Sequence, residues 1–185
     1  PHILSLTDKQ LKRLGKSEKK TDTHFDKLLR PTILGLAASA DHPEVKKWCI
    51  DTFTKIKKAD EVHADLRSVV FNTAARFGDV KTYDKLLKFH NSTDLSEERT
   101  TLAAALTSFE QPELTKRSLD LITTKNVRRQ DAMYWIAYSF INRHAKNATW
   151  QWLQDNWDWL DKELGSDLSF YRTPIYVARS FSDEK

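Results

Sequence analysis

Short polar breaks recur along this chain at nearly regular intervals. Four of them begin at Asp41, Gly78, Gln111 and Asn147, and proline or acidic residues stand where the first turn of a helix favours them. The intervals between the breaks are close to the roughly 34 residues that a two-helix repeat occupies. This recurrence predicts about four helix pairs between residues 41 and 180.

Apolar residues three and four positions apart fill the segments between the breaks. Because side chains at this spacing share one helix face, each segment is predicted to hold two amphipathic helices. The second helix of each pair is richer in alanine, which lets backbones approach closely, so these helices are expected to form an inner layer. The predicted fold class is all-α, an α-solenoid or superhelix of antiparallel helix pairs similar to HEAT and ARM repeats.

Two leading helices are expected within residues 1–40, before the first pair. The apolar pattern predicts a short one from Leu6 to Leu14 and a longer one from Thr21 to Ala38. At the other end of the chain, the fourth pair is expected from Thr149 to Leu160 and from Phe170 to Ala178.

The composition favours a single globular chain in water. Four glycines and five prolines supply little of the turn chemistry of β-hairpins, and 39% hydrophobic residues suffice for one sizeable core. The single cysteine excludes an internal disulfide, and no apolar stretch reaches the roughly 20 residues that span a bilayer. Residues 1–185 are therefore expected to form one helical-repeat domain in the cytoplasm. The absence of a leader and of an obvious structural end suggests a C-terminal fragment of a larger chain.

Positive charge exceeds negative charge only slightly, with 30 basic and 26 acidic residues and a net charge of +4. Much of the excess lies in one N-terminal run, at Lys9, Lys12, Arg13, Lys16, Lys19 and Lys20. The run has no interleaved aromatic residues that could stack on bases, which favours a solvated surface over nucleic-acid binding. No nucleic acid and no membrane is expected as a partner, although nucleic-acid binding by this run stays open as a weaker alternative.

The sequence offers no complete set of catalytic or metal-binding residues. No two of the six histidines stand three to five positions apart, the spacing that lets two imidazoles of one helix hold a metal. Cys49 stands on an apolar stripe, which favours a buried structural thiol over a nucleophile. Glycine-rich phosphate loops and nucleophile elbows are absent from the sequence. We expect no catalytic residue and no metal site in this chain.

Four polar residues close to the alanine-rich helices are candidates for lining a substrate groove: Arg67, Arg129, Gln130 and Arg143. Arg129 precedes an apolar helix, where a positive charge opposes the helix dipole, so its position needs a physical reason. One possibility is that these arginines pair with acidic residues such as Asp65, Asp131 or Glu97. The second is that they line a concave face and bind a carboxylate, which the planar guanidinium suits.

Three stretches form an ordered set of motifs that spans most of the chain. Residues 64–71 read Ala-Asp-Leu-Arg-Ser-Val-Val-Phe, and residues 126–131 read Asn-Val-Arg-Arg-Gln-Asp. Asn142 follows, and residues 150–157 then read Trp-Gln-Trp-Leu-Gln-Asp-Asn-Trp. In this order the motifs resemble the C-terminal helical domain of aminopeptidase N-type zinc metallopeptidases, with its DLRxxV[YF], VRxQD and Wx[FW][LV]xxNW helices.

The resemblance implies a role that composition and spacing do not reveal. Members of that family carry a thermolysin-like catalytic domain with an HExxH zinc helix and a GxMEN loop, and neither motif occurs in this chain. The implied function is that of a non-catalytic domain of a parent enzyme that removes N-terminal amino acids from peptides. Zinc would then belong to the parent catalytic domain. That domain and peptide substrates would be the partners of this segment. The single cysteine and the absent leader favour a bacterial, cytoplasmic parent within the family.

On this resemblance the helical domain caps the catalytic domain and helps to form a peptide chamber. Arg129 and Gln130 are the leading candidates for facing that chamber, Arg67 and Arg143 are secondary ones, and none of the four is expected to be catalytic. The alternative is a free-standing helical-repeat scaffold that binds a protein or a peptide in its groove.

Overall fold

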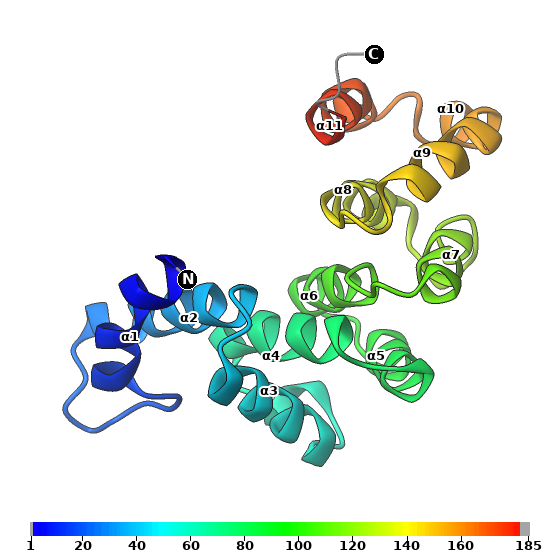
Figure 1. Ribbon diagram of the computed structural model, residues 1–185. Helices are drawn as coiled ribbons and strands as arrows, with labels where there is room; N and C mark the ends of the chain where they lie inside the picture. Colours follow the sequence, from blue (N-terminus) through cyan, green and yellow to red (C-terminus); the bar gives the residue numbers. More distant parts are fainter. Residues whose placement is uncertain (1, 182–185) are drawn as a thin grey trace. The chain divides into compact units, whose positions relative to one another are not determined.

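The computed structural model describes residues 2–181, and within that range every regular element is a helix (Figure 1). The predicted all-α fold class is confirmed. None of the helices in this range is both long enough and apolar enough to cross a lipid bilayer. The chain divides into two compact units, residues 1–74 and residues 75–185, which we describe one at a time. The prediction of a single domain over the whole chain stays a prediction.

The first unit contains α1 (His2–Leu14), α2 (His24–Ser39), α3 (Pro43–Lys55), the short 3₁₀ helix η1 (Ala59–Glu61) and most of α4 (Ala64–Arg76). Helix α1 packs along α2, and α3 meets α4 through the rings of Phe53 and Phe71, whose centroids are 5.9 Å apart. The chain between α1 and α2 is fixed by Arg30, a buried residue of α2 that donates hydrogen bonds to the Leu14 carbonyl and the Asp22 carboxylate.

The leading helices differ from the sequence-based bounds. Helix α1 begins at His2, four residues before the predicted start, and α2 begins at His24 rather than at Thr21. The later start of α2 has a local cause, because Thr23 and Asp26 form a capping box in which the Thr23 hydroxyl accepts from the Asp26 amide. This arrangement satisfies free amides at the helix start and fixes Thr23 as the N-cap.

The second unit arranges its helices in two rows (Figure 1). One row holds α6 (Ser96–Leu106), α8 (Ala132–Ile141) and α11 (Thr173–Ser180), with α8 packed between the other two. The other row holds α5 (Val80–Ser92), α7 (Pro112–Leu121), α9 (Lys146–Asp155) and α10 (Trp157–Leu164), and α5 packs on α6 while α7 and α9 pack on α8. The short 3₁₀ helices η2 (Arg129–Asp131) and η3 (Phe170–Arg172) lead into α8 and α11.

Three of the four predicted helix starts coincide with the structure. Helices α3 and α7 begin with Pro43 and Pro112, and α5 begins after Asp79, whose side chain accepts from the Thr82 amide. The fourth start lies at Lys146, one residue before the predicted break. The helix expected from Thr149 to Leu160 is divided into α9 and α10 at Asn156, whose side chain donates to the Trp152 carbonyl. Because asparagine side chains compete with the helix for backbone groups, it is a natural point of interruption.

Side-chain amides join successive loops of the second unit. The Gln111 side chain donates to the Gly78 carbonyl at 2.8 Å, and the Asn142 side chain donates to the carbonyls of Thr107 and Phe109 at 2.9 and 2.7 Å. Each of these bonds connects the loop of one helix pair with that of the pair before it. They satisfy backbone carbonyls at helix ends and fix the spacing of the repeats.

Candidate functional site

Helix α8 presents two different faces. Its residues Met133, Trp135, Ile136 and Phe140 are buried, whereas Tyr134 is half exposed and Ile141 is largely exposed. The exposed side continues through Ala137 and Tyr138, which are partly accessible. These positions are spaced by three and four residues, so they form one continuous stripe along the helix. We call Tyr134, Tyr138 and Ile141 the α8 face.

The tyrosines of the α8 face form a stacked group. The rings of Tyr134 and Tyr138 lie 6.3 Å apart at an interplanar angle of 25°. Partial burial raises the pKa of Tyr138, and the proximity of Tyr134 and of Tyr176 on α11 contributes to that rise. Tyrosine combines a rigid apolar ring with a hydroxyl group, a combination suited to contacting a peptide at low entropic cost.

The predicted groove residues Arg129 and Gln130 lie at the N-terminal end of α8. Both are exposed and belong to η2, the turn that leads into the helix. Hydrogen bonds from Ser169 lower the pKa of Asp167, in the loop after α10, and the positive charge of Arg129 adds to this effect. The preceding Arg128 instead donates to the buried Asp131 at 2.7 Å and to Ser96. Arg128 thus pairs directly with an acidic neighbour, while Arg129 and Gln130 are exposed residues of the turn at the helix start.

Arg143 lies at the other end of the same helix. Its Nε donates to Nε2 of His144 at 2.9 Å, and that ring nitrogen lies 3.7 Å from Glu110, which also pairs with Arg76 at 3.2 Å. Ten residues of α-helix rise about 15 Å. Arg143 is therefore held well apart from Arg129 and Gln130, and the three do not form one compact cluster.

The fourth predicted groove residue lies in the first unit. Arg67 is a partly buried residue of α4, and its Nε donates to the Val62 carbonyl at 2.9 Å. This bond holds the turn that precedes α4. The structure therefore gives Arg67 a local structural role, and it assigns Arg129, Gln130 and Arg143 to the two ends of the α8 face.

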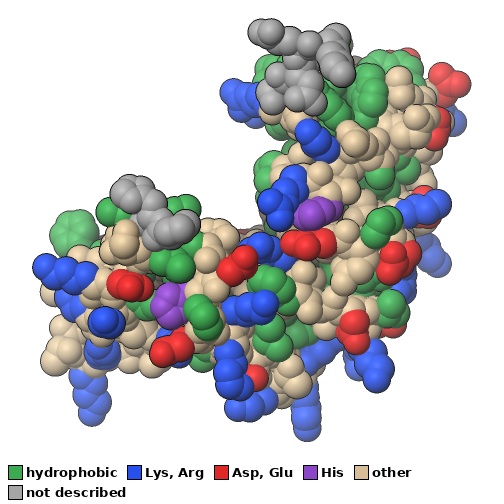
Figure 2. All heavy atoms as spheres, viewed as in Figure 1, with side chains coloured by type: hydrophobic (Ala, Val, Ile, Leu, Met, Phe, Trp, Pro, Cys, Tyr) green, Lys and Arg blue, Asp and Glu red, His purple; other side chains and the backbone are tan. Residues whose placement is uncertain are grey.

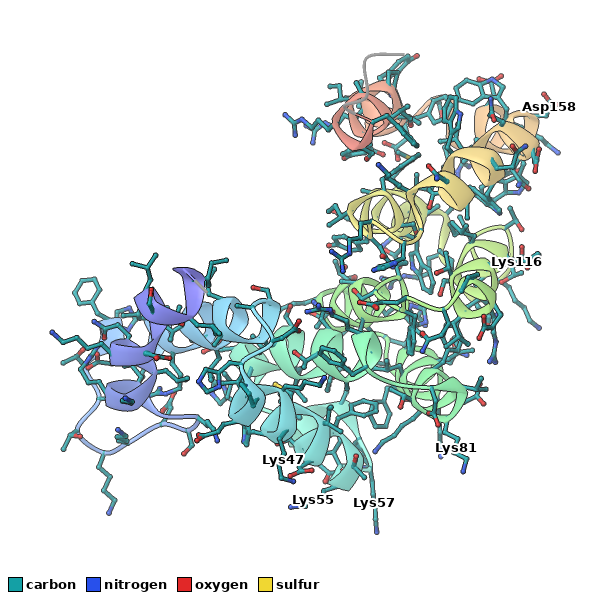
Figure 3. All side chains as sticks on the ribbon, viewed as in Figure 1. Lys47, Lys55, Lys57, Lys81, Lys116 and Asp158 are labelled. Atoms are coloured by element: carbon teal, nitrogen blue, oxygen red, sulfur yellow. The ribbon has the colours of Figure 1, made fainter. Side chains whose placement is uncertain are left out.

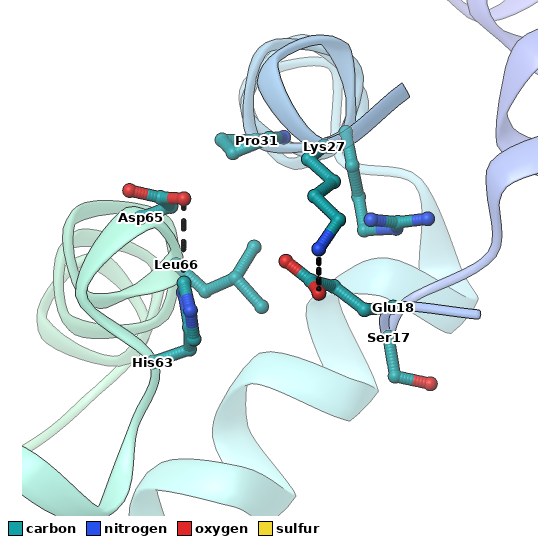
Figure 4. A pocket seen from close by; sticks show the side chains of 8 residues that line it. Ser17, Glu18, Lys27, Pro31, His63, Asp65 and Leu66 are labelled. Carbon is teal, nitrogen blue, oxygen red and sulfur yellow. Dashed lines mark ion pairs between the residues drawn. The ribbon is translucent and has the colours of Figure 1, made fainter. Parts of the chain in front are cut away.

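A cleft of about 230 Å³ lies beside α2 in the first unit (Figure 4). An ion pair links Lys27 with Glu18 at 3.0 Å, and on the α4 side of the cleft the His63 ring lies 3.7 Å from the Asp65 carboxylate. The remaining lining residues are Ser17, Arg30, Pro31 and Leu66. Because its charged side chains are already paired, this cleft offers a ligand few polar partners, and no motif or spacing in these residues indicates it in advance.

The nucleophilic and metal-binding side chains of the described residues are dispersed. No group of three or more His, Cys, Asp or Glu among residues 2–181 could hold a metal ion. Cys49 is fully buried, and this burial raises its pKa to about 11, so the thiol is protonated near neutral pH. His90 is also buried, and desolvation lowers its pKa, which keeps its ring neutral.

Basic side chains are spread over the face of the molecule that Figure 2 shows, with acidic ones among them. Lysines such as Lys47 and Lys116 point away from the ribbon and pair with acidic residues on the same helix, at 2.8 and 2.6 Å (Figure 3). Within the N-terminal basic run, Arg13 pairs with Asp26 and Lys16 with Glu44. Paired charges of this kind reduce the excess that a phosphate backbone would need.

Comparisons with known proteins agree with the sequence motifs. The family model described as "ERAP1-like C-terminal domain" matches residues 1–185. The chain is 29% identical over 179 residues to Aminopeptidase N of Lactobacillus helveticus, covering 95% of this chain and 21% of that protein. It is 28% identical over 176 residues to Aminopeptidase M1 of Arabidopsis thaliana, covering 92% of this chain and 20% of that protein. The chain thus spans about a fifth of the length of these relatives.

Proposed function

We propose, from the premise that this chain belongs to the family of ERAP1-like C-terminal domains, that it is the non-catalytic C-terminal part of a zinc-dependent aminopeptidase. The observation that carries the proposal is the match of that family model to the entire chain. Curated relatives with the names Aminopeptidase N and Aminopeptidase M1 support it, since they align with more than nine-tenths of this chain. The proposed parent removes N-terminal amino acids from peptides.

The proposal gives the catalytic domain and this segment different roles. In an enzyme of this kind, zinc polarises the scissile carbonyl and activates a water molecule. The proposal assigns zinc to the catalytic domain of the parent; among residues 2–181 no group of three or more His, Cys, Asp or Glu could hold a metal ion. The side chains of this segment then act by binding and orienting the part of the peptide that lies away from the reaction.

The α8 face is the proposed contact for that distal part of the peptide. Tyr134 and Tyr138 offer flat apolar surface. Tyr134, whose side chain also carries a hydroxyl, is half exposed. At the helix start, Arg129 and Gln130 are exposed donors that can bind peptide carbonyls or a carboxylate. Binding energy gained far from the scissile bond helps to orient the substrate, so removing it affects long peptides most.

A free-standing repeat scaffold is the second candidate function. The observation that favours it is the exposed α8 face, because an aromatic stripe serves equally well for a protein partner. Under either function we propose a cytoplasmic location, which the single, buried cysteine supports. The reading frame that contains this chain separates the two candidates, since only the first requires an upstream HExxH helix.

The decisive test is to express the protein from its complete reading frame and assay single amino-acid arylamides. We expect hydrolysis that a chelator abolishes and that added zinc restores. Residues 1–185 alone, verified as helical by circular dichroism, are the matched control and should give no turnover. A complete protein without zinc-dependent hydrolysis, or a fragment whose turnover is lost when one of its own residues is changed, would refute the proposed function.

A further inference from the structure

The rings of His90 and Trp135 meet in the interior of the second unit. His90 is 1% exposed and Trp135 is completely buried. Their ring planes are nearly perpendicular, at 89°, and the ring centroids lie 5.4 Å apart. His90 belongs to α5 and Trp135 to α8, so the contact joins helices from the two rows of the unit (Figure 1).

Each ring of this pair carries a buried polar atom that no protein group satisfies. Nε2 of His90 and Nε1 of Trp135 are both inaccessible, and neither has a hydrogen-bond partner among residues 2–181. Buried polar side-chain atoms are almost always hydrogen-bonded, because leaving one unpaired destabilises the fold. Two such atoms on one pair of touching rings therefore call for a shared partner.

The two nitrogens have complementary hydrogen-bonding roles. The indole N–H of Trp135 can only donate. Nδ1 of His90 lies 3.3 Å from Oδ1 of Asn91, and an amide oxygen only accepts, so Nδ1 carries the proton of the neutral ring and Nε2 is an acceptor. Desolvation lowers the pKa of His90 and so favours this neutral form. The ring contact thus combines one donor with one acceptor.

The charged groups around His90 add to the polar character of the site. The positive charges of Arg99 on α6 and of Arg128 before η2 lower the pKa of His90 further, whereas the carboxylate of Asp131 acts in the opposite direction. Asp131 is itself buried and paired with Arg128 at 2.7 Å. A polar interior of this kind can hold water, which a purely apolar cavity does not.

A single water molecule has the size and the chemistry to serve both nitrogens. Water accepts from one group and donates to another, and two hydrogen bonds of about 2.9 Å place its partners up to about 5 Å apart. The 5.4 Å between the ring centroids is compatible with that span. Buried waters in proteins typically bond to polar groups that would otherwise be unsatisfied.

We propose that one buried water molecule bridges the two rings, accepting from Nε1 of Trp135 and donating to Nε2 of His90. This water site satisfies both atoms and links α5 to the packed side of α8. It is built from interior residues of this segment, so it does not depend on the proposed function.

A crystal structure of the protein expressed from its complete reading frame tests the site directly. We expect an ordered water within about 3.2 Å of both ring nitrogens. The resolution must be high enough to show other buried waters. A direct N–H···N bond between the two rings, or clear density with no water between them, would overturn the proposal.

Two substitutions at His90 test the bridge in solution. A glutamine amide extends as far as Nε2 of histidine, whereas the shorter asparagine amide reaches only as far as Nδ1. We therefore expect the unfolding equilibrium constant of residues 1–185 in urea to be about five- to tenfold higher for His90→Asn than for His90→Gln, because only the asparagine loses the bond to water.

The same two substitutions in a Trp135→Phe background are the matched control. Phenylalanine keeps a ring at that position but removes the N–H that holds the water, and the comparison cancels the difference in size between asparagine and glutamine. We expect the ratio of the two unfolding constants to be at least about threefold smaller in this background. Equal ratios in the two backgrounds would refute the bridge. If Trp135→Phe does not fold, the crystal structure of the wild-type protein decides.

Discussion

Helices α6 and α8 are neighbours in one row of the second unit, yet their accessible faces are unlike. Both bury large apolar side chains completely, among them Leu102 and Leu106 in α6 and Trp135 and Ile136 in α8. None of the accessible positions of α6 is aromatic: they are Ser96, Glu97, Arg99, Thr100, Thr101 and Ala104. Those of α8 are Tyr134, Ala137, Tyr138 and Ile141. The repeat therefore constrains the packed face of each helix and leaves the other face free to differ.

The hydroxyl groups of α6 are already engaged. Thr100 and Thr101 donate to the carbonyls of Ser96 and Glu97 in the preceding turn, at 2.9 and 3.0 Å. Just after the helix, Ser108 donates to the Ala104 carbonyl at 2.6 Å. Such bonds leave little donor capacity for a ligand. A peptide that meets this row of helices would thus find aromatic surface on α8 and none on α6.

The largest expected effect concerns the packed faces, where the two helices should behave alike. Trp135→Ala is expected to lower the free energy of unfolding by about 3–5 kcal/mol, and Leu102→Ala by about 2–5 kcal/mol, because each leaves a cavity in a buried site. Tyr134→Ala, on the exposed side of α8, should cost less than about 1 kcal/mol. Urea denaturation of residues 1–185 measures all three. Equal losses for Trp135→Ala and Tyr134→Ala would break the distinction between the faces of α8.

A smaller effect is expected from pH, through a histidine that contacts the packed face of α8. The ring of His90 on α5 is buried and meets Trp135 edge-on, with centroids 5.4 Å apart, and burial lowers its pKa below the ordinary 6.5. Below pH 6.5 the unfolded chain therefore binds the proton first, and stability falls until the pH passes the pKa of the folded state.

The expected loss from this single group is less than about 1.4 kcal/mol per pH unit. We expect the free energy of unfolding of the wild-type segment to decrease more between about pH 7.5 and about pH 5.5 than that of His90→Gln. The comparison of the two proteins cancels the contribution of the other histidines. Parallel curves would mean that His90 is protonated as easily in the folded state as in the unfolded one.

Much of the fold could be predicted because its signals are local. Proline at the first helical position and an acidic N-cap mark the starts of α3, α5 and α7, and these marks act within one turn. The break at Asn156 was missed because the apolar spacing continues across it from Trp152 to Leu160. Periodicity reports which residues are apolar, and it does not detect a side chain that competes for the backbone.

The candidate site was harder to predict than the fold. Helix α8 consists almost entirely of apolar and aromatic residues, so its sequence pattern did not indicate that Tyr134 and Tyr138 lie on an accessible side. Arg128 and Arg129 are adjacent and chemically identical, and only the folded chain distinguishes the arginine that pairs with Asp131 from the exposed one. The separation of Arg143 from Arg129 likewise follows from the length of α8.

The most direct test of the proposed role of the α8 face measures the hydrolysis of two substrates by the full-length parent, a peptide of about ten residues and a single amino-acid arylamide. The variants are Arg129→Ala, Tyr134→Ala and, as the α6 control, Thr101→Ala. A contact made only by the distal part of a substrate is absent from the arylamide, and its loss appears in kcat/KM for the peptide. We predict a several-fold lower kcat/KM for the peptide in the Arg129 and Tyr134 variants, with arylamide hydrolysis unchanged and the Thr101 variant unaffected. Equal losses on both substrates, or an effect of Thr101→Ala as large as that of Tyr134→Ala, would contradict a distal-substrate role for this face.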